Sequence, residues 1–261
     1  MSRAAAAEGR LRREPDQPEP DQPAPADIEA LRTAHKAVLE RIAAAAERVG
    51  RNPADVELVC VSKSVEADRL RAAVAAGITI LGENRVQEAE AKAPEVPGAR
   101  WHMIGHLQSN KAARAVRLFD VVESVDSVEL AARLGGLAHD ALDGRPLPVY
   151  LQVNVDRDPA KAGFSPDALE AALPGLVELG GLELRGLMTV GRAVDRPEVA
   201  RSTFRGLREL RDRLRQVDSR LGTGLSMGMS DDFEVAVEEG ATVVRVGRAL
   251  FGERTSGGAA G

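Results

Sequence analysis

A lysine at the end of an apolar run is the residue of this sequence best suited to covalent chemistry. Lys63 directly follows residues 59–62, a run typical of a buried β-strand. Partial exclusion of water disfavours an ammonium ion and leaves a nucleophilic amine, which can form a Schiff base with an aldehyde or ketone. A surface lysine at a strand end is the plainer interpretation. Its position alone does not decide between the two.

Two turns rich in glycine and hydroxyl groups stand near the end of the chain. One contains Ser226, Met227 and Gly228, and the other contains Gly247, each just before a predicted helix. Free backbone N–H groups at the start of a helix bind anions, so both turns are candidate phosphate sites. Together with Lys63 they predict a phosphorylated carbonyl compound bound covalently to that lysine.

Two polar residues follow other apolar runs. Asn84 is either a ligand contact or a helix cap, and His106 either contacts a ligand ring or phosphate or is a structural histidine. No carboxylate or second histidine stands near His106 at the spacing of metal ligands, so we expect no metal site.

Eight apolar runs alternate with helical segments, and these elements must position the residues above. Near-continuous apolar runs of this kind are typical of parallel strands that helices cover on both faces. Eight strand–helix units favour a single (β/α)8 barrel of the TIM type over an open sheet. No GxGxxG follows the first run, which weakens a Rossmann interpretation. An extra helix over 28–49, with Asp27 as N-cap, precedes the barrel. The predicted strands are 57–62, 78–81, 101–104, 120–124, 148–154, 183–188, 224–226 and 242–246. The predicted helices are 66–76, 83–93, 109–118, 127–141, 166–179, 197–217, 231–239 and a brief one at 248.

Composition limits the classes of protein that fit. The proline-rich, charged segment 1–27 predicts a disordered tail, 255–261 a flexible tail, and 28–254 the folded domain. A net charge of −5 and 3% aromatic residues argue against nucleic-acid binding. The single cysteine, Cys60, excludes an internal disulfide. No apolar run reaches the roughly 20 residues of a membrane helix. We therefore expect a cytoplasmic protein.

Several motifs together resemble one known family. They are 61–63 (VSK), 82–88 (GENRVQE), 101–111 (WHMIGHLQSNK), 186–189 (GLMT), 225–234 (LSMGMSDDFE) and 244–252 (VRVGRALFG). In order across 28–254, the chain resembles the pyridoxal phosphate homeostasis proteins, whose fold is similar to the N-terminal domain of alanine racemase.

The resemblance implies a cofactor and its contacts. Pyridoxal 5'-phosphate (PLP) is expected as an internal aldimine on Lys63, and Arg245 near its pyridine nitrogen. Asn84 and His106 are expected to flank the cofactor. The residues expected at or near the phosphate are Ser226, Met227, Gly228, Gly247 and Arg248. Relatives often have threonine in place of Arg248, so its backbone amide is the expected contact. The loop after Lys63 also departs from the relatives' usual pattern.

The same resemblance implies control of free PLP and of amino- and keto-acid pools by a monomer, with apo forms of PLP-dependent enzymes as recipients. An arginine at the pyridine nitrogen weakens PLP as an electron sink. The only tyrosine, Tyr150, stands early in its strand and predicts core or bottom-face packing. The sequence ends without the β-domain that supplies a racemase's second base. We therefore predict a PLP carrier, not an enzyme. A weak PLP-dependent amino-acid racemase and an aldolase-type barrel using Lys63 without PLP stay as alternatives.

Six arginines on the helix predicted at 197–217 form the remaining charged feature. They are interspersed with Glu209 and Asp212, and mixed signs are typical of a solvated face rather than an RNA or partner site. The arginines are Arg201, Arg205, Arg208, Arg211, Arg213 and Arg215.

Overall fold

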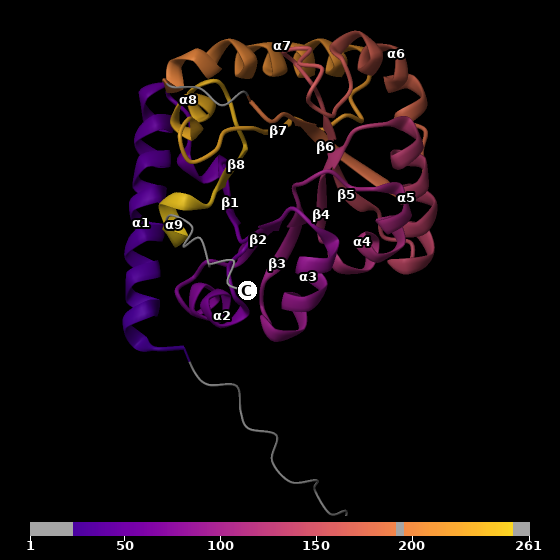
Figure 1. Cartoon of the computed structure of the whole chain (residues 1–261). Helices are drawn as coiled ribbons and strands as arrows, with labels where there is room; N and C mark the ends of the chain where they lie inside the picture. The colour runs from indigo at the N-terminus through magenta and orange to yellow at the C-terminus, as the bar shows by residue number, and fades with distance from the viewer. Residues whose placement is uncertain (1–22, 192–195, 253–261) are drawn as a thin grey trace, which may run out of the picture.

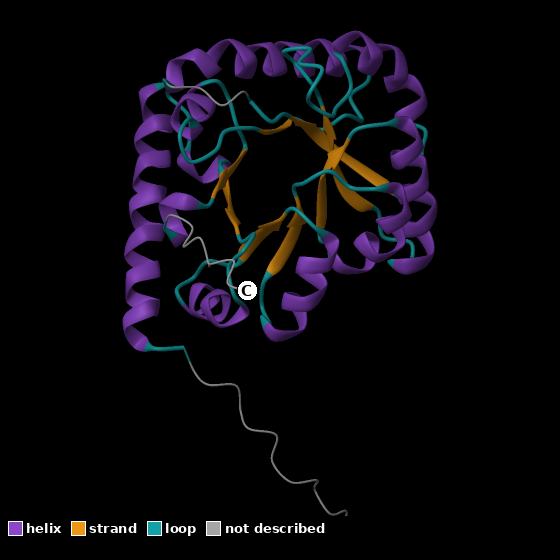
Figure 2. Cartoon of the chain, viewed as in Figure 1, coloured by secondary structure: helices purple, strands orange, loops and turns teal. Residues whose placement is uncertain are grey.

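Eight parallel strands form a closed barrel, and helices surround it (Figures 1 and 2). The computed structural model describes residues 23–191 and 196–252. Each strand pairs with the next along the chain, and β8 closes the barrel against β1, with Val59 opposite Arg245. The predicted (β/α)8 barrel with an N-terminal helix is confirmed.

The barrel strands are short, and most are followed by a helix. The strands are β1 (Glu57–Val61), β2 (Ile80–Glu83), β3 (Arg100–Met103), β4 (Val121–Val125), β5 (Leu147–Gln152), β6 (Leu182–Met188), β7 (Gly224–Ser226) and β8 (Val243–Val246). The α-helices are α1 (Pro25–Arg48), α2 (Ala67–Ala75), α3 (Val86–Lys92), α4 (Ala112–Leu118), α5 (Val128–Ala141), α6 (Pro166–Leu176), α7 (Arg201–Val217), α8 (Phe233–Glu238) and α9 (Arg248–Phe251). Short 3₁₀ helices are η1 (Pro53–Asp55), η2 (Ala93–Glu95), η3 (Ser109–Lys111) and η4 (Pro197–Ala200).

Helix α1 begins earlier than predicted. Pro25 takes its first position, where the fixed φ of proline suits a helix and the missing N–H costs nothing. Asp27 therefore lies in the first turn, and its expected role as N-cap is wrong. Leu31, Val38 and Ile42 bury the inner face of α1, which runs along one side of the barrel (Figure 1). Residues 1–22 and 253–261, which include most of the predicted N-terminal tail and all of the predicted C-terminal tail, lie outside the described residues.

Strand β2 lies two residues further along the chain than predicted. Ile78 follows the turn at Gly77 and is buried before the strand begins. The strand includes Gly82, where the barrel interior is narrow: a Cβ on this residue would lie 2.8 Å from Val59 Cγ1. The predicted helices 109–118 and 197–217 each divide into a 3₁₀ turn and an α-helix. The helix predicted at 83–93 begins only at Val86, because Glu83 belongs to β2, and a 3₁₀ turn that contains Pro94 follows it.

Side chains inside the barrel form a cluster separate from the layer under the helices. Val59, Ile104, Val121, Tyr150, Met188 and Val243 make up this inner cluster. Tyr150 is buried there beside Gly224, where an added Cβ would lie 2.7 Å from the tyrosine ring, so the expectation of core packing holds. Because strand side chains alternate between faces, the inward Val59 places Val61, the last residue of β1, on the inner side as well.

The arginine-rich helix α7 is less solvated than expected. Arg201 forms ion pairs with Glu198, Glu238 and Glu239, and the last of these is buried. The opposite face packs on the core through Leu207 and Leu210. Several of the arginines therefore fasten α7 to α8, which the mixed charges alone did not predict.

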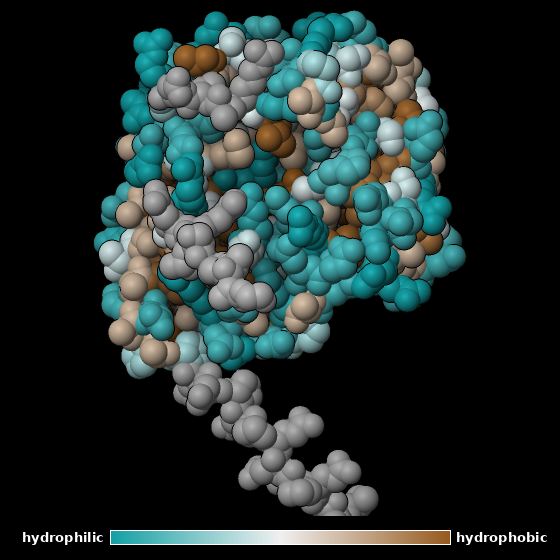
Figure 3. Space-filling view, viewed as in Figure 1, coloured by the Kyte–Doolittle hydropathy of each residue, from teal (hydrophilic) through white to brown (hydrophobic). Residues whose placement is uncertain are grey.

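The outer surface seen in Figure 3 is largely hydrophilic, with scattered apolar residues. The described large hydrophobic residues that are exposed come from separate elements, among them Leu39, Val128 and Val217. Within the described ranges, no helix is long and apolar enough to span a membrane.

Candidate functional site

Lys63 stands in a tight turn at the carboxyl end of β1. The turn closes where Val65 N donates to Ser62 O at 3.0 Å, and Ser64 within it has a φ of 62°. Ser62 itself is fully buried, and its N–H donates to Gly82 O at 2.9 Å. The strand end that carries the lysine is thus fixed to the neighbouring strand β2.

A cavity of about 650 Å³ opens at the carboxyl ends of the strands. Such ends carry the active sites of barrels of this type. The cavity brings together five residues singled out in the sequence: Lys63, Asn84, Arg245, Gly247 and Arg248. The other lining residues are Val61, Ile104, Val190, Met229, Ser230 and Asp231.

Polar groups of the last two strand ends face this cavity. Gly247 N donates to Ser230 Oγ at 3.3 Å, and Arg248 pairs with Asp231. A Cβ on Gly247 would lie 3.2 Å from Val61 O, so a larger residue there would need a small shift of the neighbouring strand end. Sequence reasoning missed Ser230. It stands in the same hydroxyl-rich turn as Ser226, directly before the helix predicted at 231–239, and that place in the turn was the available signal.

Four predicted residues lie outside the lining of this cavity, and three of them follow β7. Ser226 is fully buried inside the barrel, where its Oγ donates to Glu123 Oε2 at 2.6 Å and accepts from Arg245. Met227 packs in the core under the helices. Gly228 has a φ of 94° and accepts a hydrogen bond from Arg245 N through its carbonyl at 3.0 Å. Ser226 and Gly228 therefore contact Arg245, which lines the cavity, whereas Met227 packs outside the barrel interior.

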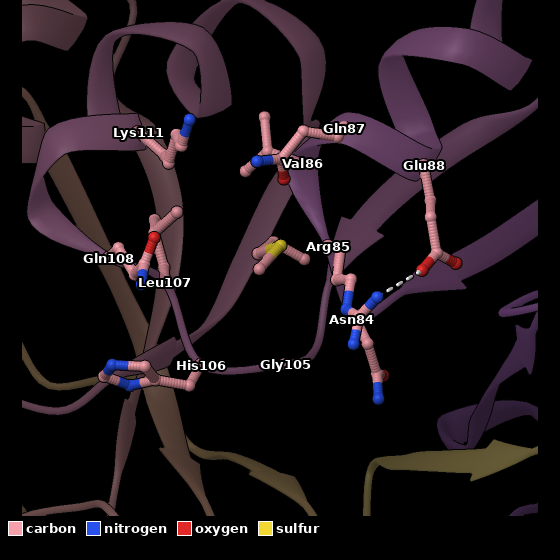
Figure 4. A pocket seen from close by; sticks show the side chains of 11 residues that line it. Asn84, Arg85, Val86, Gln87, Glu88, Gly105, His106, Leu107, Gln108 and Lys111 are labelled. Carbon is pink, nitrogen blue, oxygen red and sulfur yellow. Dashed lines mark ion pairs between the residues drawn. The ribbon is translucent and has the colours of Figure 1, made fainter.

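His106 lines a second cavity, of about 590 Å³, that shares only Asn84 with the first. Figure 4 shows His106 and Lys111 on one side of it and the ion-paired Arg85 and Glu88 on the other. The histidine Nδ1 lies 2.9 Å from Asp126 Oδ2, and its side chain is 62% exposed. His106 and Lys63 thus face different spaces.

Arg245 forms the floor of the first cavity and is almost fully buried. Its Nη2 donates to Thr189 O at 2.7 Å, and its Nη1 lies 3.7 Å from Glu123 Oε2. Burial lowers the pKa of this guanidinium, while the charges of Glu123 and Asp232 raise it. Because the ordinary arginine pKa is so high, Arg245 stays charged at neutral pH.

Glu123 is the counter-charge to Arg245. Burial alone would raise the pKa of its carboxyl, but the hydrogen bond and charge of His102, whose Nδ1 lies 2.7 Å away, and the charge of Arg245 hold that pKa below its ordinary value. The cavity floor is therefore a buried ion pair.

Comparison with known proteins gives the family. The family model for the alanine racemase N-terminal domain matches residues 34–255. Pyridoxal phosphate homeostasis proteins of Pseudomonas aeruginosa and Aquifex aeolicus are 43% and 40% identical to this chain over 223 and 219 residues, which are 84% and 83% of this chain and 94% and 95% of theirs. The chain belongs to the pyridoxal phosphate homeostasis protein family. The resemblance seen in its motifs is confirmed.

Solved structures of this family share the barrel. PipY of Synechococcus elongatus, solved with PLP bound, is 42% identical with a TM-score of 0.72, over 82% of this chain and all of PipY. A Bifidobacterium adolescentis protein is 35% identical with a TM-score of 0.79, over 87% of this chain and 97% of that one. An alanine racemase of Clostridium difficile, at 16% identity and a TM-score of 0.65, shares the fold.

Proposed function

We propose that this member of the homeostasis family holds PLP as a reserve, with Lys63 Nζ bonded to the aldehyde carbon as a Schiff base and water released. The carrying observation is that Lys63, Arg245 and Gly247, from the adjoining strands β1 and β8, line one cavity. Its family membership and the PLP-bound structure of PipY support the proposal.

The chemical character of the lining residues fits PLP. Lys63 supplies an amine that can react with the aldehyde, and the guanidinium of Arg245 is a donor for the pyridine nitrogen. The Ser230 hydroxyl, the Gly247 N–H and Arg248 offer donors and positive charge for the phosphate. Val61 and Ile104 add apolar surface for the ring. A volume of about 650 Å³ suits a small cofactor.

The residues around the cavity favour binding over turnover. When bound, PLP serves as an electron sink, most strongly with a protonated ring nitrogen. Arg245 can only donate a hydrogen bond and so favours the unprotonated nitrogen. Tyr150 is buried among the inner cluster, and burial raises the pKa of its phenol, which disfavours a role as second base. We extend the proposal to a cytoplasmic monomer that buffers PLP, delivers it to apoenzymes and influences amino- and keto-acid pools without robust turnover.

Titration with PLP, followed by the visible absorbance of the lysine adduct, tests this function. We expect the wild type to form the adduct stoichiometrically and Lys63→Ala to lose it. Lys36→Ala, which removes an exposed lysine of α1, is the matched control and retains the signal. Equal adduct formation by the Lys63 variant would reject the proposed site.

The two alternatives predict other results. Incubation with single-enantiomer amino acids would reveal a racemase as sustained inversion that Lys63→Ala abolishes, and we expect none. An aldolase-type barrel would use Lys63 without PLP, and the purified protein would then show no adduct absorbance.

A further inference from the structure

The turn that carries Lys63 has a backbone conformation that its sequence does not favour. Val65 N donates to Ser62 O across the four residues of this turn, and Ser64 has a φ of 62°. Lys63 is absent from the described residues with positive φ, which makes this the pattern of a type II turn. Its third position is normally glycine or asparagine, because other L-residues are disfavoured there. The surroundings must therefore hold Ser64 in place.

Lys92, the last residue of α3, supplies such a hold. Its Nζ donates to Ser62 O at 3.0 Å, the same oxygen that accepts Val65 N. Its Nζ also lies 2.7 Å from Glu83 Oε1, to which Ser62 Oγ donates at 2.8 Å. Both the carbonyl and the hydroxyl of Ser62 are thus tied to one ion pair. Hydrogen bonds from a charged donor are stronger than neutral ones.

Glu83 occupies an unfavourable position for an ion pair that serves stability alone. Its side chain is fully buried, and within the described ranges its Oε2 has no hydrogen-bond partner. Burial raises the pKa of this carboxyl, against the opposing effect of Lys92. Buried pairs with incomplete hydrogen bonding contribute little net stability. Glu83 also directly precedes Asn84, which lines the cavity, so the pair is attached to two strand ends of the site.

We propose that Lys92 is a positioning residue: through the Ser62 carbonyl and Glu83 it holds the type II turn closed and thereby directs Lys63 into the cavity. This inference rests on the proposed function of Lys63. A Lys92 that only neutralised Glu83 would affect the stability of the fold and leave the turn and the reactivity of Lys63 unchanged.

The test uses variants that leave no buried charge unpaired. Glu83→Gln with Lys92→Met removes both charges, and Ser64→Gly added to this pair gives a residue that accepts positive φ at no steric cost. Lys36→Met, on the exposed surface of α1, is the control. Two quantities are measured in each protein: hydrogen exchange of the Val65 amide, which reports turn closure, and the dissociation constant for PLP.

We expect the double variant to exchange the Val65 amide faster and to bind PLP about ten-fold more weakly, the loss of roughly one charged hydrogen bond. Ser64→Gly should recover most of that affinity, and Lys36→Met should change neither quantity. Unchanged exchange and affinity in the double variant would overturn the inference, as would a loss of affinity that Ser64→Gly does not recover. If the wild type formed no adduct at Lys63, the proposed function would fail, and Val65 exchange alone would still decide whether Lys92 closes the turn.

Discussion

At the scale of single residues, the floor of the cavity is formed by charged side chains that lie far apart in the sequence and close together in the fold. Arg245 of β8, Glu123 of β4 and His102 of β3 form one buried network. Their separation in sequence hides this contact, because only closure of the barrel brings these strands' inner faces together. The family resemblance identified Arg245 as a site residue, but no feature of the sequence predicted that Glu123 would be its partner.

Removing the charge of Glu123 should therefore destabilise the protein. Glu123→Gln removes one of the two carboxylates whose charges oppose the buried guanidinium of Arg245, and we expect a loss of about 3 kcal/mol in the free energy of unfolding. Urea denaturation measures it. Glu183→Gln, at an exposed residue paired with Arg185, is the matched control and should change stability by less than about 0.5 kcal/mol. Equal effects of the two substitutions would contradict the described network.

The same carboxyl predicts a pH dependence. The pKa of Glu123 is lowered in the folded state, so its contribution to stability is complete above the ordinary glutamate pKa and declines as pH falls through the folded-state value. Between about pH 5 and about pH 3 the wild type should lose more stability than Glu123→Gln. Urea denaturation at several pH values checks this difference. Parallel curves would show that Glu123 carries no lowered pKa.

The candidate site was predicted in part from residue types. Lys63 and Gly247 follow apolar strands, and the carboxyl ends of those strands meet at one mouth of the barrel, where both residues line the cavity. Ser226 was chosen for its hydroxyl in a glycine-rich turn, but β7 ends at that residue and directs its side chain into the barrel, while Ser230 lines the cavity. Which of two nearby serines faces a cavity depends on the residue at which the strand ends. The sequence pattern does not predict strand ends to the accuracy of a single residue.

At the scale of elements, apolar runs predicted all eight strands, because parallel barrel strands are buried on both faces. Their limits were less accurate. Strand β2 contains Gly82 and Glu83, residue types that are uncommon in strands, and the pattern of apolar residues therefore did not predict its end. The close approach of Val59 explains why position 82 is a glycine.

Helix α1 contributes to the barrel through Arg51, just after its C-terminus. Arg51 Nη1 donates to Val237 O at 2.5 Å and Nη2 to Ala241 O at 2.8 Å, at the end of α8 and before β8. Arg51→Met leaves both carbonyls without these donors and should lower the free energy of unfolding by about 2 kcal/mol. Arg32→Met, which breaks an exposed pair with Glu29, should have little effect. Thermal and urea denaturation of both variants measure the difference, and equal stability would show that Arg51 does not fasten α1.

At the scale of the whole molecule, barrel closure places the first and last strands side by side. Lys63 after β1 and Gly247 after β8 are far apart in sequence and line one cavity for this reason. The order of the strands thus brings an amine, a buried guanidinium, a backbone N–H and a serine hydroxyl to one mouth of the barrel. We propose that PLP occupies this mouth, bonded to Lys63.

Borohydride reduction of the PLP-loaded full-length protein, followed by peptide mass mapping, tests that claim most directly. Reduction converts the bond between lysine and PLP into a stable secondary amine, so the modified residue can be located. We expect one PLP-sized addition, on the peptide that contains Lys63, and none on that peptide after Lys63→Ala. An unmodified Lys63, with the addition on another lysine or absent, would contradict both the site and the function proposed for it.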